Sequence, residues 1–196
     1  TRHAGELEIL LEKEEDISQD LRMSKEELEY SAYHDSLTDL PNRAYLMERL
    51  KFLVEMGSTL SEDYYIVFLD LSRFKNINEI MGHSVGDDVL KIVALRLRRA
   101  LRDEDTISRL GGDEFQVMLP DMDDRGQLGE LAERIVKILS QPYPIDDKRA
   151  TIGTSIGIAI APYDGIEKDE LVRSSDLALY AAKNSGRGQY RFFSAN

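Results

Sequence analysis

The sequence predicts an α+β domain in which a mixed central sheet is flanked by helices and preceded by a long N-terminal helix. A continuous apolar, aromatic and β-branched run over residues 64–71 is typical of a buried strand. Two short apolar runs surround Gly111 and Gly112, which predicts a tight hairpin. Segments with apolar residues at helical spacing alternate with these strands. Because a hairpin pairs its strands antiparallel, we expect a mixed sheet and not a fully parallel one.

The order of elements follows from the same patterns. A turn over residues 40–43 starts the second helix, and the glycines of residues 82–86 predict a loop. Helices are expected at residues 1–33, 43–56, 73–80, 87–101, 128–139 and 171–183. Strands are expected at residues 64–71, 106–109, 115–119, 151–160 and 189–193.

The N-terminal helix divides the chain into residues 1–33 and a globular domain of residues 34–196. Its apolar residues follow the a/d spacing of a coiled coil, with polar interruptions at Glu14, Ser24 and Ser31; they are Leu7, Leu10, Ile17, Leu21 and Leu28. The first 30 residues hold ten acidic and four basic side chains, too many charges for a buried helix. One interpretation is a solvated helix packed weakly on its own domain. The favoured one is a two-stranded signalling coil that joins the domain to an upstream sensor.

Composition narrows the class of protein. The 196 residues include 42% apolar residues and no cysteine, which excludes disulfides and thiolate zinc sites and fits a cytoplasmic location. No apolar run approaches the roughly 18 residues of a membrane span, and no leader is visible. A start without Met suggests a piece of a longer protein, whose remainder could hold a membrane anchor. The net charge of −12 argues against binding a nucleic-acid polymer but allows a single nucleotide held with metal ions.

Carboxylates occur at two turns that a sheet could bring together. Asp70 ends the buried apolar run, and Asp113 and Glu114 follow the two glycines of the predicted hairpin. Individually, Asp70 could cap a turn, and the acidic pair could be merely solvated. If the strands are neighbours, Asp70 and Asp113 could share a cation, because carboxylates with water and phosphate oxygens are the usual ligands of Mg²⁺.

Several motifs, in order and spacing, resemble the GGDEF family of diguanylate cyclases over residues 35–193. They are residues 35–43 (DSLTDLPNR), 70–75 (DLSRFK) with Asn78, Gly82-His83 with Gly86-Asp87, 109–115 (RLGGDEF), 155–157, 176–180, Ala182-Lys183 and Gly186-Arg187. The resemblance implies the nucleotidyl-cyclase or polymerase-palm arrangement of a central sheet. It also implies an enzyme that joins two GTP molecules into cyclic di-GMP and releases two pyrophosphates.

The resemblance implies a metal site. Asp70 and Asp113 correspond to ligands of Mg²⁺, with Mn²⁺ as the alternative ion, and the carbonyl of Leu71 assists them. Glu114 corresponds to a further acidic group at the reacting centre, either linked to the metal or helping the 3′-hydroxyl to lose its proton.

The resemblance also implies how GTP is bound. Asn78 and Asp87 correspond to residues that hydrogen-bond guanine, which suits an amide and a carboxylate. Their alternative roles are a turn residue and a helix N-cap. Lys75, Lys183 and Arg187 correspond to phosphate-binding cations, although Lys183 and Arg187 could be ordinary C-terminal helix cations. Phe74, Gly111 and Gly112 complete the expected substrate site.

Further partners are implied as well. Since each domain would hold one GTP, catalysis implies a homodimer. Arg102 and Asp105 form an Arg-x-x-Asp pattern at the family's spacing from Gly111, which implies an inhibitory site for cyclic di-GMP; the alternative is a surface ion pair. The end of the chain resembles the boundary before a downstream EAL phosphodiesterase domain.

Two positions depart from the family's pattern. Ser72 and Glu79 stand where the family usually has aspartate. Ser72 removes a negative charge beside the expected metal site and shares a face with Asp70 if the strand persists. The alternative function is therefore a catalytically weak module that binds GTP or cyclic di-GMP and regulates a neighbouring domain.

Overall fold

The computed structural model describes residues 2–60, 64–120, 125–161 and 163–194. Its helices are α1 (Arg2–Tyr33), α2 (Arg43–Leu60), α3 (Phe74–Met81), α4 (His83–Ala100), α5 (Arg125–Leu139) and α6 (Lys168–Asn184). Its strands are β1 (Tyr64–Ser72), β2 (Thr106–Gly111), β3 (Glu114–Pro120), β4 (Tyr143–Ile145), β5 (Lys148–Ala150), β6 (Gly153–Ala161) and β7 (Tyr190–Phe192). In the described part of the chain, no helix is long and apolar enough to cross a membrane.

The central sheet has five strands in the order β2-β3-β1-β6-β7. β1 pairs antiparallel with both β3 and β6, whereas β6 pairs parallel with β7, so the sheet is mixed as predicted. β2 and β3 form the predicted hairpin at one edge. A separate two-stranded hairpin, β4-β5, was missed because three-residue strands are too short to show a periodic pattern.

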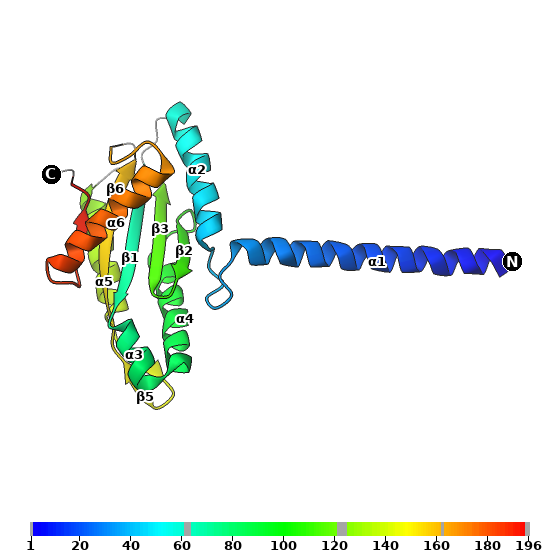
Figure 1. Cartoon of the computed structure of the whole chain (residues 1–196), viewed down its shortest axis with the longest axis horizontal. Coiled ribbons are helices and arrows are strands. Elements are labelled where there is room, and N and C mark those ends of the chain that lie inside the picture. Colours follow the sequence, from blue (N-terminus) through cyan, green and yellow to red (C-terminus); the bar gives the residue numbers. More distant parts are fainter. Residues whose placement is uncertain (1, 61–63, 121–124, 162, 195–196) are drawn as a thin grey trace.

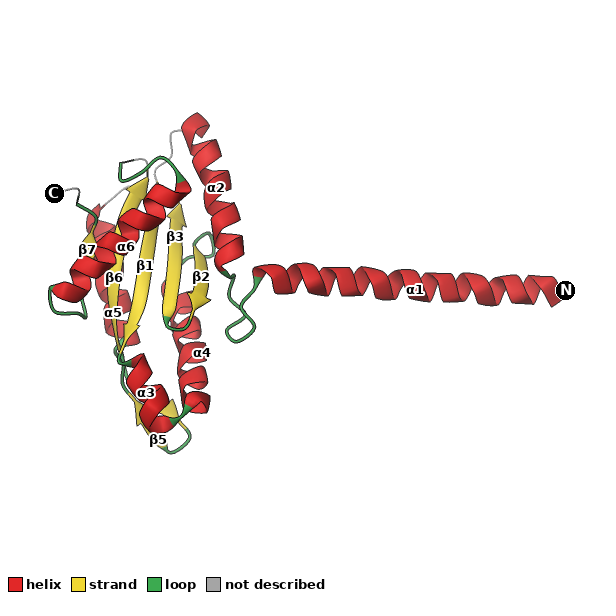
Figure 2. Cartoon of the chain, viewed as in Figure 1, coloured by secondary structure: helices red, strands yellow, loops and turns green. Residues whose placement is uncertain are grey.

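Helices cover both faces of the sheet (Figure 2). On one face, inward residues such as Leu69, Phe115 and Ile158 join residues of α4 and α5 in the larger core. On the other, α2 supplies Leu46 and Leu50, which pack with residues of β3, β6 and α6 in a smaller cluster. Successive residues of β3 and β6 are buried, so both faces of these strands are covered, which explains their continuous apolar character.

Helix α1 extends away from the globular body as a single rod (Figure 1). None of its residues is buried, and the stripe of leucine and isoleucine side chains is exposed, for example Leu10 at 62% and Leu28 at 71%. The alternative in which this helix packs along its own domain is therefore not what the structure shows. Pairing with a second helix remains a prediction.

The largest error in the predicted elements lies at residues 82–86, which form no loop beyond Gly82. α4 begins at His83, so Asp87 lies inside the helix and is not its N-cap. Asn78 likewise lies inside α3 and not in a turn. Gly86 is buried where the two helices meet, and a Cβ there would stand 1.8 Å from Asn78 Oδ1. This glycine permits close helix packing, which a sequence pattern does not distinguish from a turn.

Candidate active site

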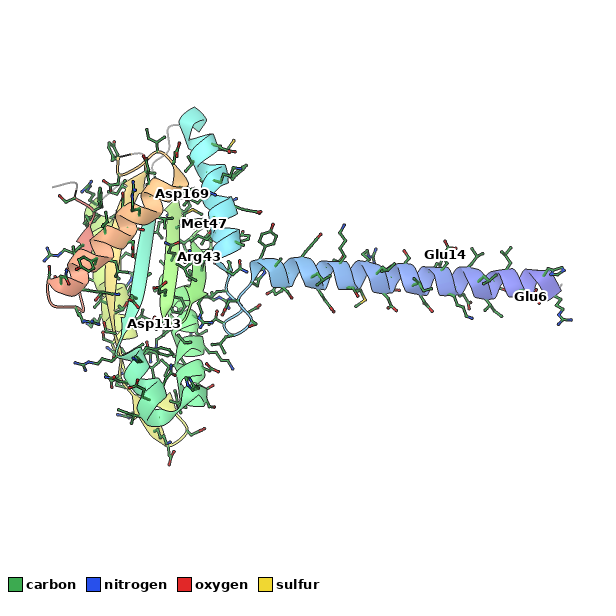
Figure 3. All side chains as sticks on the ribbon, viewed as in Figure 1. Glu6, Glu14, Arg43, Met47, Asp113 and Asp169 are labelled. Carbon is green, nitrogen blue, oxygen red and sulfur yellow. The ribbon has the colours of Figure 1, made fainter. Side chains whose placement is uncertain are left out.

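The hairpin between β2 and β3 brings the expected carboxylates to the end of β1. Asp70 lies opposite Glu114 in the strand register, and the Leu71 N–H donates to the Asp113 carbonyl at 3.1 Å. Gly111 and Gly112 have φ values of 145° and 51°, in the left-handed region that glycine adopts without strain. Figure 3 shows Asp113 at the end of the sheet next to α3. β1 continues through Ser72, so Ser72 and Asp70 do share a face.

Asp70 is mostly buried and has one charged partner. Its Oδ2 pairs with Nζ of Lys183 on α6; the Asp70 side chain is 14% exposed and that of Lys183 is 31% exposed. Its Oδ1 is buried and has no hydrogen-bond partner among the described residues. A buried carboxylate oxygen without a partner is costly, so this atom is suited to a ligand that the protein alone does not supply.

The surroundings of Asp113 disfavour the ionised form of its carboxyl. Burial raises the pKa of this carboxyl, the negative charge of Asp70 raises it further, and Glu114 adds a smaller effect in the same direction. A backbone N–H and Lys183 lower the pKa without cancelling the rise. A cation between Asp70 and Asp113 would relieve this repulsion.

The residues present fit a magnesium ion for which the protein supplies only some of the ligands. Within the described residues, no three histidine or acidic side chains gather as a group that could hold a metal. Asp70 and Asp113 would therefore act as two carboxylate ligands, with backbone carbonyl, water and phosphate oxygens completing the shell, which is how Mg²⁺ is commonly held. The assignment of Glu114 as a direct ligand stays a prediction.

The candidate guanine-binding residues meet at the corner between α3 and α4. Asn78 on α3 contacts the position of Gly86, and Asp87 follows that glycine on α4 with its side chain exposed. Phe74, also on α3, is 6% exposed and packs into the core. The structure thus places the Asn78 side chain against Gly86, the residue before Asp87, and buries Phe74 in the core.

The expected phosphate-binding cations come from three segments: α3, α6 and the turn after α6. Lys75 is exposed on α3, and Lys183 reaches Asp70 from α6. Arg187 lies in the turn after α6 with φ 55° and lines a pocket of about 730 Å³ together with Lys75. Lys183 thus pairs with an active-site carboxylate, whereas Arg187 is exposed, and the phosphate-binding role of both residues stays a prediction.

The Arg-x-x-Asp segment between α4 and β2 is a closed turn. Arg102 donates from its backbone N–H to Asp105 Oδ2 at 2.8 Å, and from Nη2 to Asp105 Oδ1 at 2.9 Å and to the Pro120 carbonyl at 2.8 Å. The Asp105 side chain is fully buried, whereas that of Arg102 is 38% exposed. Asp105 thus anchors Arg102 at the rim of a pocket of about 360 Å³ that Arg98 and Tyr45 also line.

An ion pair that the sequence analysis did not identify holds the hairpin tip. Arg109 Nη1 pairs with Asp35 Oδ1 at 2.9 Å, and its Nε and Nη2 donate to the Gly112 carbonyl at 3.1 and 3.0 Å. Asp35 also accepts from the backbone N–H and hydroxyl of Thr38. Both residues begin motif segments, but 74 positions separate them in the chain, so the pattern carried no sign of the pairing.

This ion pair predicts a pH-dependent contribution to stability. Burial alone would raise the pKa of Asp35, but the Thr38 hydroxyl and N–H and the Arg109 guanidinium outweigh it and lower the pKa below 3.8. A lowered pKa stabilises the fold above the unfolded value, and that stability is lost as the pH falls through the folded value. Asp35→Asn should therefore lower the free energy of unfolding by about 1–2 kcal/mol at pH 7.

Urea titrations of wild type and Asp35→Asn at pH 7 and near pH 3 would measure this difference. The gap between the two proteins should shrink at the acid end. Asp147→Asn, at an exposed position in the β4-β5 turn, is the matched control. A gap of equal size at both pH values would contradict the assignment.

Comparisons with known proteins agree with this geometry. The family model described as "Diguanylate cyclase, GGDEF domain" matches residues 32–189. The bifunctional diguanylate cyclase/cyclic di-GMP phosphodiesterase MucR of Pseudomonas aeruginosa is 42% identical over 176 residues, which are 90% of this chain and 26% of MucR. The chain thus spans about a quarter of the length of that relative.

Two solved structures share the fold. The GGDEF domain of TpbB from Pseudomonas aeruginosa has a TM-score of 0.80 at 36% identity, covering 83% of this chain and 95% of that one. The coiled coil and GGDEF domain of DgcB from Caulobacter crescentus, in complex with c-di-GMP, has a TM-score of 0.84 at 26% identity, covering 95% and 98%. The five-stranded mixed sheet, the hairpin carrying Asp113 and Glu114, and the matched residues 32–189 together show that this chain belongs to the GGDEF diguanylate cyclase family.

Proposed function

We propose that the chain condenses two GTP molecules into cyclic di-GMP and two pyrophosphates. The observation that carries this proposal is the meeting of Asp70, Asp113 and Lys183, where a buried carboxylate oxygen lacks a partner among the described residues. Two carboxylates and a lysine at one place suit the binding of a metal ion with a nucleotide's phosphates. A catalytically weak module that binds GTP would use the same arrangement, so only turnover separates the two functions.

Each residue of the site has a proposed role. Asp70, Asp113 and the Leu71 carbonyl hold Mg²⁺, which supplies Lewis-acid activation of the phosphates and of the attacking hydroxyl when bound. Lys183 exchanges its contact with Asp70 for a phosphate oxygen as GTP enters. Glu114, opposite Asp70 in the register, accepts the proton of the 3′-hydroxyl in this proposal.

The reaction needs two copies of the chain, because each site holds one GTP. We propose that α1 supplies this dimer as a parallel two-stranded coil. The exposed apolar stripe of α1 supports pairing, and the polar layers at Glu14, Ser24 and Ser31 make the coil weak enough to be regulated. We further propose that the chain belongs to a cytoplasmic protein with an upstream sensor and a downstream EAL-type domain. The greater length of relatives such as MucR supports the presence of further domains.

The direct test is product formation from GTP and Mg²⁺ at rising protein concentration. We expect cyclic di-GMP and pyrophosphate in a 1:2 ratio, a rate per chain that rises as the chain dimerises, and loss of activity with EDTA. Replacing Mg²⁺ by Mn²⁺ in the same assay identifies which ion supports turnover. A sample that binds GTP as a dimer but forms no product would favour the regulatory module.

A single methyl group should disturb guanine recognition. In Gly86→Ala the new Cβ would stand 1.8 Å from Asn78 Oδ1, so the Asn78 side chain must leave its position. We expect GTP affinity to fall about tenfold, the effect of one lost hydrogen bond to the base. Isothermal titration with GTP measures this. Gly5→Ala, where a Cβ meets nothing within 4 Å, is the control, and unchanged affinity would contradict the role of Asn78.

A second binding function is supported by the pocket at Arg102. Arg102 donates a hydrogen bond to the buried carboxylate of Asp105, and this contact fixes the position of its guanidinium at the pocket rim. We propose that cyclic di-GMP binds here and inhibits the enzyme. Arg102→Ala should raise the concentration of cyclic di-GMP needed for half-inhibition by about tenfold or more while the uninhibited rate stays within twofold. Inhibition curves measure this, and identical curves would remove the site.

A further inference from the structure

Lys183 occupies one side of the candidate metal site. Its Nζ pairs with Oδ2 of Asp70, and the two side chains are only 31% and 14% exposed. The attraction between opposite charges is stronger where water is largely excluded than at the open surface. Lys183 thus holds one of the two carboxylate oxygens that a metal ion at Asp70 would use.

The positive charge of Lys183 also acts on the second carboxylate of the site. The pKa of Asp113 is raised first by burial and then by the charge of Asp70, and Lys183 opposes this rise. One ammonium group therefore partly neutralises both expected metal ligands. A divalent cation that approached them with Lys183 in place would meet a like charge and less negative charge to attract it.

The remaining oxygen of Asp70 is held in place without a partner. Oδ1 is buried and has no hydrogen-bond partner among the described residues. The backbone on both sides is fixed, since Thr154 Oγ1 donates to the Asp70 carbonyl at 3.0 Å and the Leu71 N–H donates to the Asp113 carbonyl at 3.1 Å. One oxygen of this carboxylate is therefore available to a cation, while Lys183 occupies the other.

Helix α6 is packed too closely on the sheet to carry Lys183 away from Asp70. At Gly157 on β6, a Cβ would stand 2.2 Å from the Leu179 backbone nitrogen and from the Ser175 carbonyl oxygen. Ala182, the neighbour of Lys183, is fully buried. Release of Asp70 therefore requires rotation of the Lys183 side chain, whose flexible stem and partial exposure permit it.

We propose that Lys183 excludes Mg²⁺ from the carboxylate pair until a nucleotide enters, so that metal and GTP bind together. The inference rests on the proposed function and deepens it, because it makes one residue responsible for the order of binding. The negative charge of a triphosphate draws the ammonium group from Asp70 to a phosphate oxygen. This exchange frees Oδ2 and supplies phosphate ligands at the same time. By linkage, metal and nucleotide raise each other's affinity by the same factor.

A lysine that only contacts phosphate would behave differently. Its removal would weaken nucleotide binding and leave the affinity for metal alone unchanged. Removal of a lysine that excludes the metal tightens metal binding in the absence of nucleotide. One measurement, the affinity for metal without nucleotide, therefore separates the two roles.

The test measures metal binding without nucleotide, so it does not depend on turnover. The probe is Mn²⁺, whose free ion is quantified by electron paramagnetic resonance during titration into wild type, Lys183→Gln, Lys183→Met and Lys183→Arg. Glutamine removes the charge but can still donate a hydrogen bond to Asp70, which guards against a buried carboxylate left without any partner. Lys91→Gln, at an exposed position of α4, controls for the loss of one positive charge.

We expect Lys183→Gln and Lys183→Met to bind Mn²⁺ about tenfold more tightly than the wild type, within the usual range of coupling between two sites. Lys183→Arg keeps the charge and Lys91→Gln keeps the pair, so both should stay within about twofold of wild type. Adding Asp70→Asn to Lys183→Gln should abolish the tightened site. The unreactive α,β-methylene analogue of GTP should tighten Mn²⁺ binding to the wild type more than to either uncharged variant.

Equal Mn²⁺ affinity of the wild type, Lys183→Gln and Lys183→Met would overturn the proposal. So would a tightened site that survives Asp70→Asn, because the ion would then be bound elsewhere on a chain with a net charge of −12. Failure of the proposed cyclase is seen separately, as absent product from a protein whose Mn²⁺ affinity still rises when Lys183 is replaced.

Discussion

Asp113→Asn is expected to lower the rate of cyclic di-GMP formation by about a thousandfold or more. The substitution keeps the size of the side chain and removes one of the two carboxylates at the candidate metal site. Metal assistance to phosphoryl transfer contributes several kcal/mol to the barrier, and each 1.36 kcal/mol is a factor of ten in rate. Initial rates at saturating GTP and Mg²⁺ measure the loss.

The same variant should fold at least as stably as the wild type without metal. The raised pKa of Asp113, caused first by burial and then by the charge of Asp70, means that its ionised form is disfavoured in the folded protein. That cost is present above the raised pKa and disappears as the carboxyl is protonated, so removing the charge relieves it at pH 7. Loss of activity with undiminished stability would therefore separate a metal-site defect from unfolding.

Glu130→Gln, on an exposed position of α5, removes one negative charge elsewhere and is the matched control. Its rate should stay within twofold of wild type. If Asp113→Asn retained the wild-type rate, the assignment of the hairpin carboxylate to the metal site would be wrong. If it lost both activity and structure, Asp113 would be a folding residue.

Gly157→Ala is expected to cause the largest loss of stability of any single methyl group at a glycine of this sheet. Gly157 lies on β6 against α6, and a Cβ would stand 2.2 Å from both the Leu179 backbone nitrogen and the Ser175 carbonyl oxygen. Backbone atoms cannot rotate away as a side chain can, so α6 must shift. Overpacking of this kind costs about 3 kcal/mol or more, against a total stability of about 5–15 kcal/mol.

The shift should also reach the active site, because α6 carries Lys183, the partner of Asp70. We expect urea unfolding at a lower midpoint and weaker GTP binding. Gly153→Ala is the matched control on the same strand: its Cβ would meet Ser72 Cβ at 3.7 Å, an ordinary contact. Equal stability of the two variants would mean that the sheet and α6 pack less tightly than the structure shows.

The sequence predicted the long elements well because their patterns are repeated over many residues. The apolar run of β1, the hairpin at Gly111-Gly112 and the amphipathic helices each gave several concordant positions. The errors fell where a pattern was short or ambiguous. β4 and β5 have three residues each. The glycines of residues 82–86 predict a loop, although Gly86 allows close contact between α3 and α4.

The residues of the candidate site also fall into two groups, those that the sequence could identify and those that it could not. Asp70, Asp113 and Glu114 could be named from the sequence because each follows a recognisable strand or turn. The partners that tune them could not, because their contacts join residues far apart in the chain. Lys183 lies 113 positions from Asp70, and Arg109 lies 74 positions from Asp35.

The sequence by itself determined the class of fold, the family and the chemical types available: carboxylates after turns, an amide and a carboxylate for guanine, and scattered cations. Those features are local, since they depend on periodicity, glycine and charge over a few residues. Only the tertiary structure decided that Asp70 keeps an oxygen without a partner among the described residues, and that Arg109 fixes the hairpin tip. It also placed the ammonium group of Lys183 against the carboxylate of Asp70. Strand register and helix packing set these distances, and both depend on the whole chain folding at once.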